Sequence, residues 1–112
     1  MKPYEVEILL AEVGPTPAED KMYHITYDGT VMDKEGCTVL GGRAETIGEA
    51  LESRYQRGMS ADAAIRLAVE LLGSSEAPLG PDQLEVAILD RRRPRRAFRR
   101  LRDDELAAIL AG

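Results

Sequence analysis

The apolar residues of this chain change their spacing at Gly41-Gly42. Before this pair they alternate with polar residues, and after it they recur every three or four residues. Alternation is typical of half-buried β-strands, whereas a period near 3.6 residues is typical of amphipathic helices. A run of strands followed by a run of helices indicates an α+β fold, with helices layered on one face of a mostly antiparallel sheet.

Four strands are expected before the glycine pair, at residues 4–11, 22–27, 30–32 and 37–40. The stretch 14–21 between the first two is a predicted loop, because its prolines cannot donate a hydrogen bond to a sheet ladder. Asp28-Gly29 favours a two-residue hairpin with a type I′ turn, which requires positive φ at both positions. Together these signals predict an antiparallel meander.

Two helices, a strand pair and a last helix are expected after the glycine pair. The helices are predicted at about 44–57 and at 61–72, the second capped by Ser60 and apolar enough to be buried on two sides. Strands at 84–90 and 97–101 form the pair. Asp103 is the expected cap of the last helix, which carries Leu106, Ile109 and Leu110.

Composition points to a globular protein with an aliphatic core. The chain has 112 residues, of which 44% are hydrophobic and only 4% aromatic, enough for one domain or part of one. Because the first strand begins almost at Met1 and the helix at 61–72 needs more partners than one sheet supplies, residues 1–112 are expected to form a single partial domain. No apolar run approaches the ~20 residues of a membrane span, and no signal peptide is recognisable. The single cysteine, Cys37, cannot form an internal disulfide, which fits a cytoplasmic location.

The charges of the chain are unevenly distributed. Residues 91–102 contain eight arginines and no acid, whereas the remainder carries a net charge of −13. An anionic partner or an acidic protein surface would therefore dock at this block. The candidate contact residues are Arg91, Arg92, Arg93, Arg95 and Arg96. The other interpretation is a hairpin whose turn contains Pro94 and whose arginines pair with acids on a neighbouring surface.

Catalytic patterns are not evident. Cys37 and His24 could be imagined as nucleophile and base, but no local motif supports the pair. Gly41-Gly42 lacks the spacing of a phosphate-binding loop, and Glu45 stands where an anion would bind. We therefore predict no catalytic residue, no cofactor and no metal site.

Several strings in the sequence resemble the α subunit of actinobacterial 20S proteasomes. The strings are Lys2-Pro3-Tyr4-Glu5-Val6-Glu7, Tyr27-Asp28-Gly29-Thr30, Gly41-Gly42, Leu84-Glu85-Val86-Ala87 and Arg93-Pro94-Arg95-Arg96-Ala97-Phe98-Arg99-Arg100. The resemblance covers about the C-terminal half of such a subunit. It implies the second half of the four-layer αββα sandwich of the N-terminal-nucleophile hydrolase family.

The resemblance implies a structural function. Proteasome α subunits are non-catalytic, because the nucleophile is an N-terminal threonine of the β subunits, whereas this sequence starts with Met1. The implied role is to scaffold the protease in an α-ring and to help control substrate entry. Implied partners are β subunits, other α subunits and ring ATPase activators. The alternative function is a small regulatory or nucleic-acid-binding module that uses the basic hairpin Arg91–Arg102, although the acidic remainder makes nucleic acid an unfavourable partner.

Half of such a sandwich would leave one sheet face uncovered. In the first predicted strand, apolar side chains point to both faces near residues 8–11. Since monomeric soluble proteins rarely expose large apolar patches, we expect self-association into a dimer or larger assembly. Ile8 or Leu10 would then lie near the interface.

Overall fold

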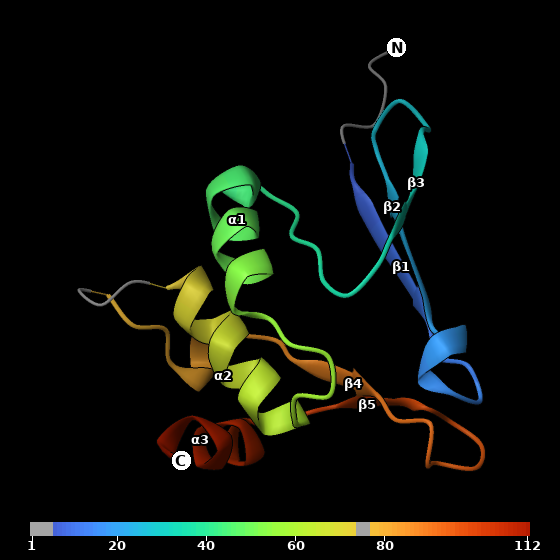
Figure 1. Cartoon of the computed structure of the whole chain (residues 1–112). Coiled ribbons are helices and arrows are strands. Elements are labelled where there is room, and N and C mark those ends of the chain that lie inside the picture. Colours follow the sequence, from blue (N-terminus) through green and yellow to red (C-terminus); the bar gives the residue numbers. More distant parts are fainter. Residues whose placement is uncertain (1–5, 74–76) are drawn as a thin grey trace.

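The computed structural model describes residues 6–73 and 77–112, and it contains an α+β arrangement of strands and helices (Figure 1). The strands are β1 (Ile8–Glu12), β2 (Lys21–Ile25), β3 (Val31–Lys34), β4 (Ala87–Leu89) and β5 (Phe98–Arg100). The helices are α1 (Ala44–Arg54), α2 (Ala61–Leu72) and α3 (Asp103–Ala111), with single 3-10 turns at Pro17–Glu19 and Pro81–Gln83. The predicted fold class is confirmed, and the helices of the described residues are too short to cross a membrane.

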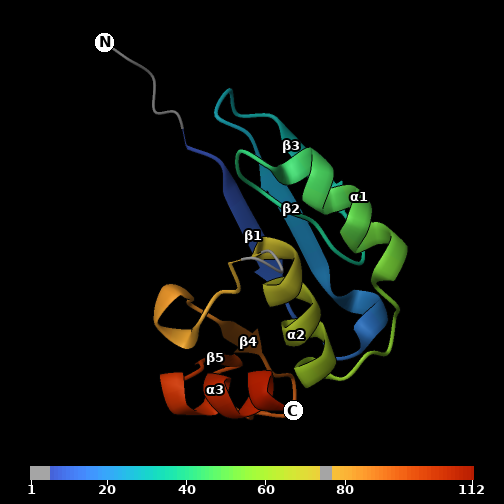
Figure 2. The same cartoon turned by 90° about the vertical axis from the view of Figure 1, so that its left-hand side faces the viewer.

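The strands form two separate antiparallel sheets. β1, β2 and β3 form the first sheet in that order, with Ile8 opposite Ile25 and Ile25 opposite Val31. β4 and β5 form the second sheet, as expected for the strand pair. Figure 2 shows the helices on one side of the first sheet, with α1 in front of β3. The strand order makes β1 and β3 edge strands, and within residues 6–73 and 77–112 no helix lies over the opposite side of the sheet.

The hairpin between β2 and β3 differs from the predicted type I′ turn. The amide of Thr26 donates to the carbonyl of Thr30, and the amide of Gly29 donates to the carbonyl of Thr26, which encloses a three-residue loop. Gly29 has a φ of +88°, but no described non-glycine residue has positive φ. Asp28 keeps negative φ because its carboxylate accepts from the Thr30 amide at 3.1 Å and from the Thr26 hydroxyl. This is a type I turn followed by a glycine bulge.

The predicted strand at 37–40 is wrong. This segment has no strand pairing and leads from the sheet to α1 (Figure 1). The chain reverses at Gly36, and the amide of Cys37 donates to the carbonyl of Glu35 two residues earlier. That tight turn carries the backbone away from the edge of β3, so an extended, apolar segment has no neighbouring strand with which to form a ladder.

The helix limits also differ in detail from the prediction. α1 ends at Arg54 rather than at 57, because Tyr55 already has extended backbone angles. Ser60 caps α2 as predicted, and its hydroxyl accepts from the Ala63 amide at 3.1 Å. The cap of α3 is Arg102, and Asp103 is the first helical residue.

The buried core is small and lies at the C-terminal end of the structure. Within the described residues, the buried apolar side chains are Leu67 of α2, Leu101 after β5 and Leu106 of α3, of which Leu106 is the most deeply buried. The prediction that α2 is buried on two sides is wrong, because Leu67 alone is buried in that helix and Leu72 is 48% exposed. The first sheet contributes no buried residue, because helices cover only one of its faces and cover it loosely.

The accessible surface reflects this loose coverage. The chain exposes 8762 Å². A folded monomer of this mass is expected to expose roughly 6,100 Å². Its radius of gyration is 15.2 Å. A compact domain of this length has about 13 Å. The structure therefore presents far more surface than a self-contained domain of its size.

Candidate functional site

The side of the first sheet that faces away from α1 is apolar, and we call it the outer sheet face. Alternation along the strands places on it Ile8 and Leu10 of β1, Tyr23 and Ile25 of β2, and Val31 of β3. Ile8, Leu10 and Val31 are 49%, 54% and 59% exposed. In a sheet with one face packed on a core, apolar residues of this kind would be covered by other parts of the protein. Their exposure indicates that this face is a contact surface.

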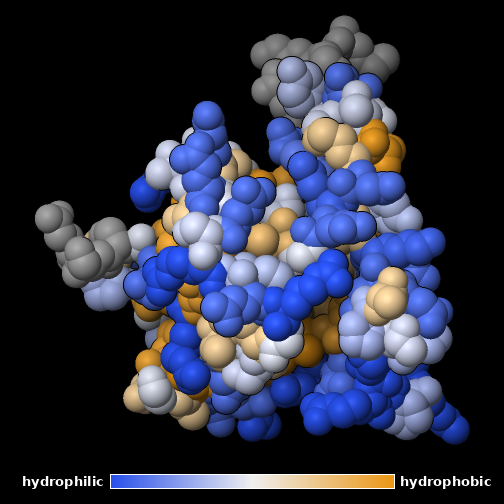
Figure 3. Space-filling view, viewed as in Figure 1, coloured by the Kyte–Doolittle hydropathy of each residue, from blue (hydrophilic) through white to orange (hydrophobic). Residues whose placement is uncertain are grey.

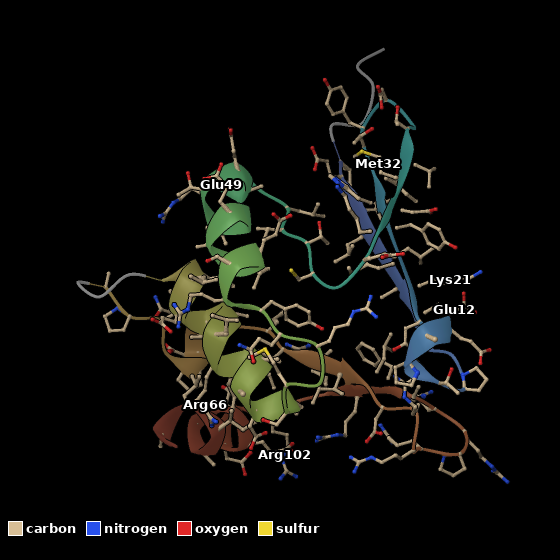
Figure 4. The ribbon with its side chains drawn as sticks, viewed as in Figure 1. Glu12, Lys21, Met32, Glu49, Arg66 and Arg102 are labelled. Atoms are coloured by element: carbon tan, nitrogen blue, oxygen red, sulfur yellow. The ribbon has the colours of Figure 1, made fainter. Side chains whose placement is uncertain are left out.

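The labelled side chains distinguish the two faces of the sheet. In Figure 4 Met32 lies on the side of the helices, whereas Lys21 and Glu12 extend to the opposite side. Lys21 lies opposite Glu12 in the β1–β2 register, at one end of the outer sheet face. Asp33 of β3 lies opposite Tyr23 and shares this face. The face is thus an apolar strip with Glu12 and Lys21 at one end and Asp33 on its β3 edge.

The inner side of the sheet borders an open cleft. A cavity of about 380 Å³ lies between the ends of β1 and β2, the loop after α1, and β4; it is lined among others by Met22, Tyr55 and Leu89. Figure 3 shows hydrophobic surface exposed in this gap between sheet and helices. The lining is mixed, because charged residues such as Lys34, Glu35 and Arg57 stand beside the apolar ones. An open cleft of this kind, with no recognisable catalytic constellation, is typical of incomplete packing rather than of an active site.

The hypothetical pair of Cys37 and His24 does not form. His24 Nε2 lies 2.8 Å from a carboxylate oxygen of Glu7. Cys37 lines a different cleft, between β3 and α1. Burial, and secondarily the charge of Glu52, raise the pKa of the Cys37 thiol, which is the opposite of what a nucleophilic cysteine needs. Among the described residues there is also no cluster of three His, Cys, Asp or Glu side chains that could hold a metal ion.

The predicted basic hairpin forms, and we call residues 91–102 the arginine hairpin. Arg91 lies where β4 ends, and its guanidinium donates to both carboxylate oxygens of Asp20 at 2.7 and 2.6 Å. The same guanidinium donates to the Gly14 carbonyl at 2.7 Å, and the Gly14 amide donates to Asp20 at 2.8 Å. The Arg91 hydrogen bonds, with that amide, lower the pKa of Asp20 to about 2. This network ties the arginine hairpin to the β1–β2 connection.

Most other arginines of the hairpin are also paired within the molecule. The pairs with carboxylates are Arg92 with Asp90, Arg99 with Glu105, Arg100 with Glu85, and Arg102 with Asp104 and Glu105. Arg93 donates instead to the carbonyl of Phe98 across the hairpin, at 2.9 Å. The interpretation of a hairpin whose arginines pair with nearby acids therefore describes much of this geometry.

Arg95 and Arg96 lie at the tip of the hairpin and are exposed. Within the described parts of the chain, neither forms an ion pair with an acid. Of the five arginines predicted as an anion or protein contact, these two remain free to serve as one, while Arg91 and Arg92 are already held by carboxylates. The contact itself stays a prediction.

Sequence reasoning did not identify the partner of Arg91. Asp20 is 71 positions away in the sequence, and its neighbours carry no spacing signal that points to an arginine. Asp20 and Arg91 meet only because folding brings the β1–β2 connection next to the arginine hairpin.

Comparison with known proteins assigns the chain to a family. The family model described as proteasome subunit matches residues 1–89. Proteins named proteasome subunit alpha are similar over nearly the whole chain: that of Kineococcus radiotolerans is 48% identical, covering 99% of this chain and 51% of its own length. That of Acidothermus cellulolyticus is 50% identical, covering 97% and 49%, and that of Actinosynnema mirum is 46% identical, covering 98% and 45%. The chain thus spans about half the length of these relatives, and the resemblance found in its sequence is confirmed: it belongs to the proteasome subunit family.

Proposed function

We propose that this chain is a non-catalytic structural part of a bacterial proteasome α-ring, where it scaffolds the core particle and helps to control substrate entry in the cytoplasm. The observation that carries the proposal is the outer sheet face, which is apolar and uncovered in a chain that is half as long as its relatives. We infer that another polypeptide segment packs on this face and completes the layered fold. Proteasome β subunits, other α subunits and ring ATPase activators are the proposed partners.

The absence of catalysis is part of the proposal. The hydroxyl of Thr26 is engaged by the Asp28 carboxylate, and that of Thr16 donates to Glu19 at 3.0 Å. Both partners are carboxylates, which are weaker bases than the amine or imidazole that activates a nucleophilic threonine or serine. The pKa of the Cys37 thiol is raised, which disfavours the nucleophilic thiolate. We expect no turnover of fluorogenic peptides by the pure chain. Turnover that a threonine-directed inhibitor abolishes would contradict this.

Assembly with complementary parts tests the proposal. The chain is mixed with the N-terminal half of the Kineococcus radiotolerans α subunit and with a proteasome β subunit, and the products are analysed by native mass spectrometry. We expect ring-sized assemblies that contain this chain. The control replaces this chain with the C-terminal half of the same Kineococcus subunit. Assembly with the control but not with this chain would refute the proposal.

The nucleic-acid-binding alternative gains no support from the geometry. Five of the eight arginines face carboxylates of the same molecule. With about two or three arginines left to touch phosphates, binding should be weak, and the slope of log affinity against log salt should be about −2 to −3. Tight, sequence-dependent binding at physiological salt would instead favour the alternative.

A further inference from the structure

We propose that the outer sheet face docks on the same face of a second copy of this chain, in a two-fold dimer in which β1 of each copy lies over β2 of the other. The proposal goes beyond the function proposed above, because it concerns the isolated chain and needs no other proteasome subunit. It commits to face-to-face packing of sheets rather than to pairing of edge strands.

The distribution of apolar residues places the centre of the patch between β1 and β2. Ile8 lies opposite Ile25, and Leu10 lies opposite Tyr23, so these four side chains form a two-by-two block. A two-fold axis that runs along the strands between β1 and β2 maps this block onto itself. Each isoleucine then packs on an isoleucine of the other copy, and each leucine packs on a tyrosine. Aligned packing of sheets about 10 Å apart has this geometry.

The charges at the end of the face fit the same axis. Glu12 and Lys21 are register partners on β1 and β2, and both extend away from the helices (Figure 4). Within the described residues neither forms an ion pair, although they lie side by side. The two-fold axis places Glu12 of each copy over Lys21 of the other, which creates two charge pairs at the rim. A self-complementary patch of this kind is what a two-fold interface requires.

The accessible surface is sufficient for such a dimer. The chain exposes 8762 Å². This is about 2,700 Å² more than expected for a compact monomer of its mass. A standard interface removes about 800 Å² from each partner, which is less than a third of this excess. The excess belongs to the molecule as a whole, and the exposed side chains of Ile8, Leu10 and Val31 on the outer sheet face contribute to it. A second copy that covers this face would reduce the excess.

Substitutions on the two faces of β1 test the proposal. Leu10 on the outer face and Leu9 on the inner face are adjacent and are 54% and 42% exposed. We expect sedimentation velocity to show a dimer with a dissociation constant in the micromolar range, and Leu10→Lys to raise that constant at least about tenfold. Leu9→Lys is the matched control and should change it less than about threefold. Circular dichroism verifies that both variants keep the wild-type fold.

A charge exchange tests the orientation. Glu12→Lys and Lys21→Glu should each weaken the homodimer, because each brings like charges together. A mixture of the two variants should form a heterodimer that is tighter than either homodimer, since opposite charges then meet at both positions. Low salt should enlarge the difference.

Three results would overturn the proposal. A monomer at all concentrations up to ~100 µM would show that the face needs no second copy. Equal weakening by Leu9→Lys and Leu10→Lys would indicate pairing through the edge of β1. A lack of preference for the heterodimer would exclude the proposed axis. Each of these results leaves assembly with a complementary proteasome half unaffected, so failure of this proposal is distinct from failure of the proposed function.

Discussion

The effect on stability of removing the ion pair between Asp20 and Arg91 can be worked out directly from the structure. Their side chains are 39% and 31% exposed, and the guanidinium engages both carboxylate oxygens. Asp20→Asn removes the charge and keeps the size of the side chain. Because the pair ties the arginine hairpin to the β1–β2 connection, its loss should weaken the contact between two parts of the chain that are far apart in sequence.

The magnitude follows from the pKa of Asp20, which falls from its ordinary value of 3.8 to about 2. Undiscounted, this difference corresponds to roughly 2.5 kcal/mol of stability when the carboxylate is charged. Both partners are about one-third exposed, so solvent screening reduces the effective contribution to about 1 kcal/mol. We therefore expect Asp20→Asn to lower the free energy of unfolding at neutral pH by about 1 kcal/mol.

The pH dependence has a defined sign. A carboxylate whose pKa is depressed by folding stabilises the native state above its unfolded pKa, and this stability is lost as the pH falls through the folded pKa. The difference between wild type and Asp20→Asn should thus be constant above about pH 5 and decrease to a small fraction of its neutral value near pH 2. Urea titrations monitored by circular dichroism at several pH values measure this difference in unfolding free energy. The contributions of the other carboxylates cancel because both proteins contain them.

A double-mutant cycle that combines Asp20→Asn with Arg91→Met measures the coupling free energy between the two side chains. The coupling energy should be about 1 kcal/mol and should decrease with salt. The comparison variant is Asp90→Asn, whose carboxylate is 18% exposed but pairs with Arg92, which is 87% exposed and only two residues away. It should cost less than Asp20→Asn. A coupling energy below about 0.2 kcal/mol, or a difference at pH 2 as large as at neutral pH, would refute the reasoning.

Four further predictions concern packing and reactivity. Gly14→Ala should destabilise the fold by about 1–3 kcal/mol in urea titrations, because its Cβ would lie 2.6 Å from that of Glu19. Gly48→Ala in α1 meets no atom within 4 Å and should stabilise by about 0.5–1 kcal/mol; a loss of stability there would contradict the helix assignment. Leu106→Ala, at a side chain that is 2% exposed, should cost about 2–5 kcal/mol, and a smaller cost would mean that the α3 contact is not the core. Cys37 should react with iodoacetamide more slowly than a free cysteine peptide, because its pKa is raised, and an equal rate would disprove this.

The local elements of the fold were predictable because they depend on neighbouring residues. The alternation in β1 and β2, the period of α2 and the Ser60 cap all act over a few positions, and the structure contains each of them. The segment 37–40 has equally good strand residues but no partner strand, and partners are a property of the whole fold. The same limit applies to Arg91, because no local pattern of the sequence points to its pairing with Asp20.

The two proposals made for this chain compete for one surface. A complementary proteasome half and a second copy would both cover Ile8 and Leu10 on the outer sheet face, so they cannot bind at the same time. Addition of the complementary half should therefore dissociate the dimer in proportion to its concentration. Leu10→Lys should weaken both complexes, whereas Lys21→Glu should weaken only the dimer, whose two-fold axis places this lysine over Glu12. The relative affinities would then decide whether the free chain stays paired with itself or is recruited into a ring.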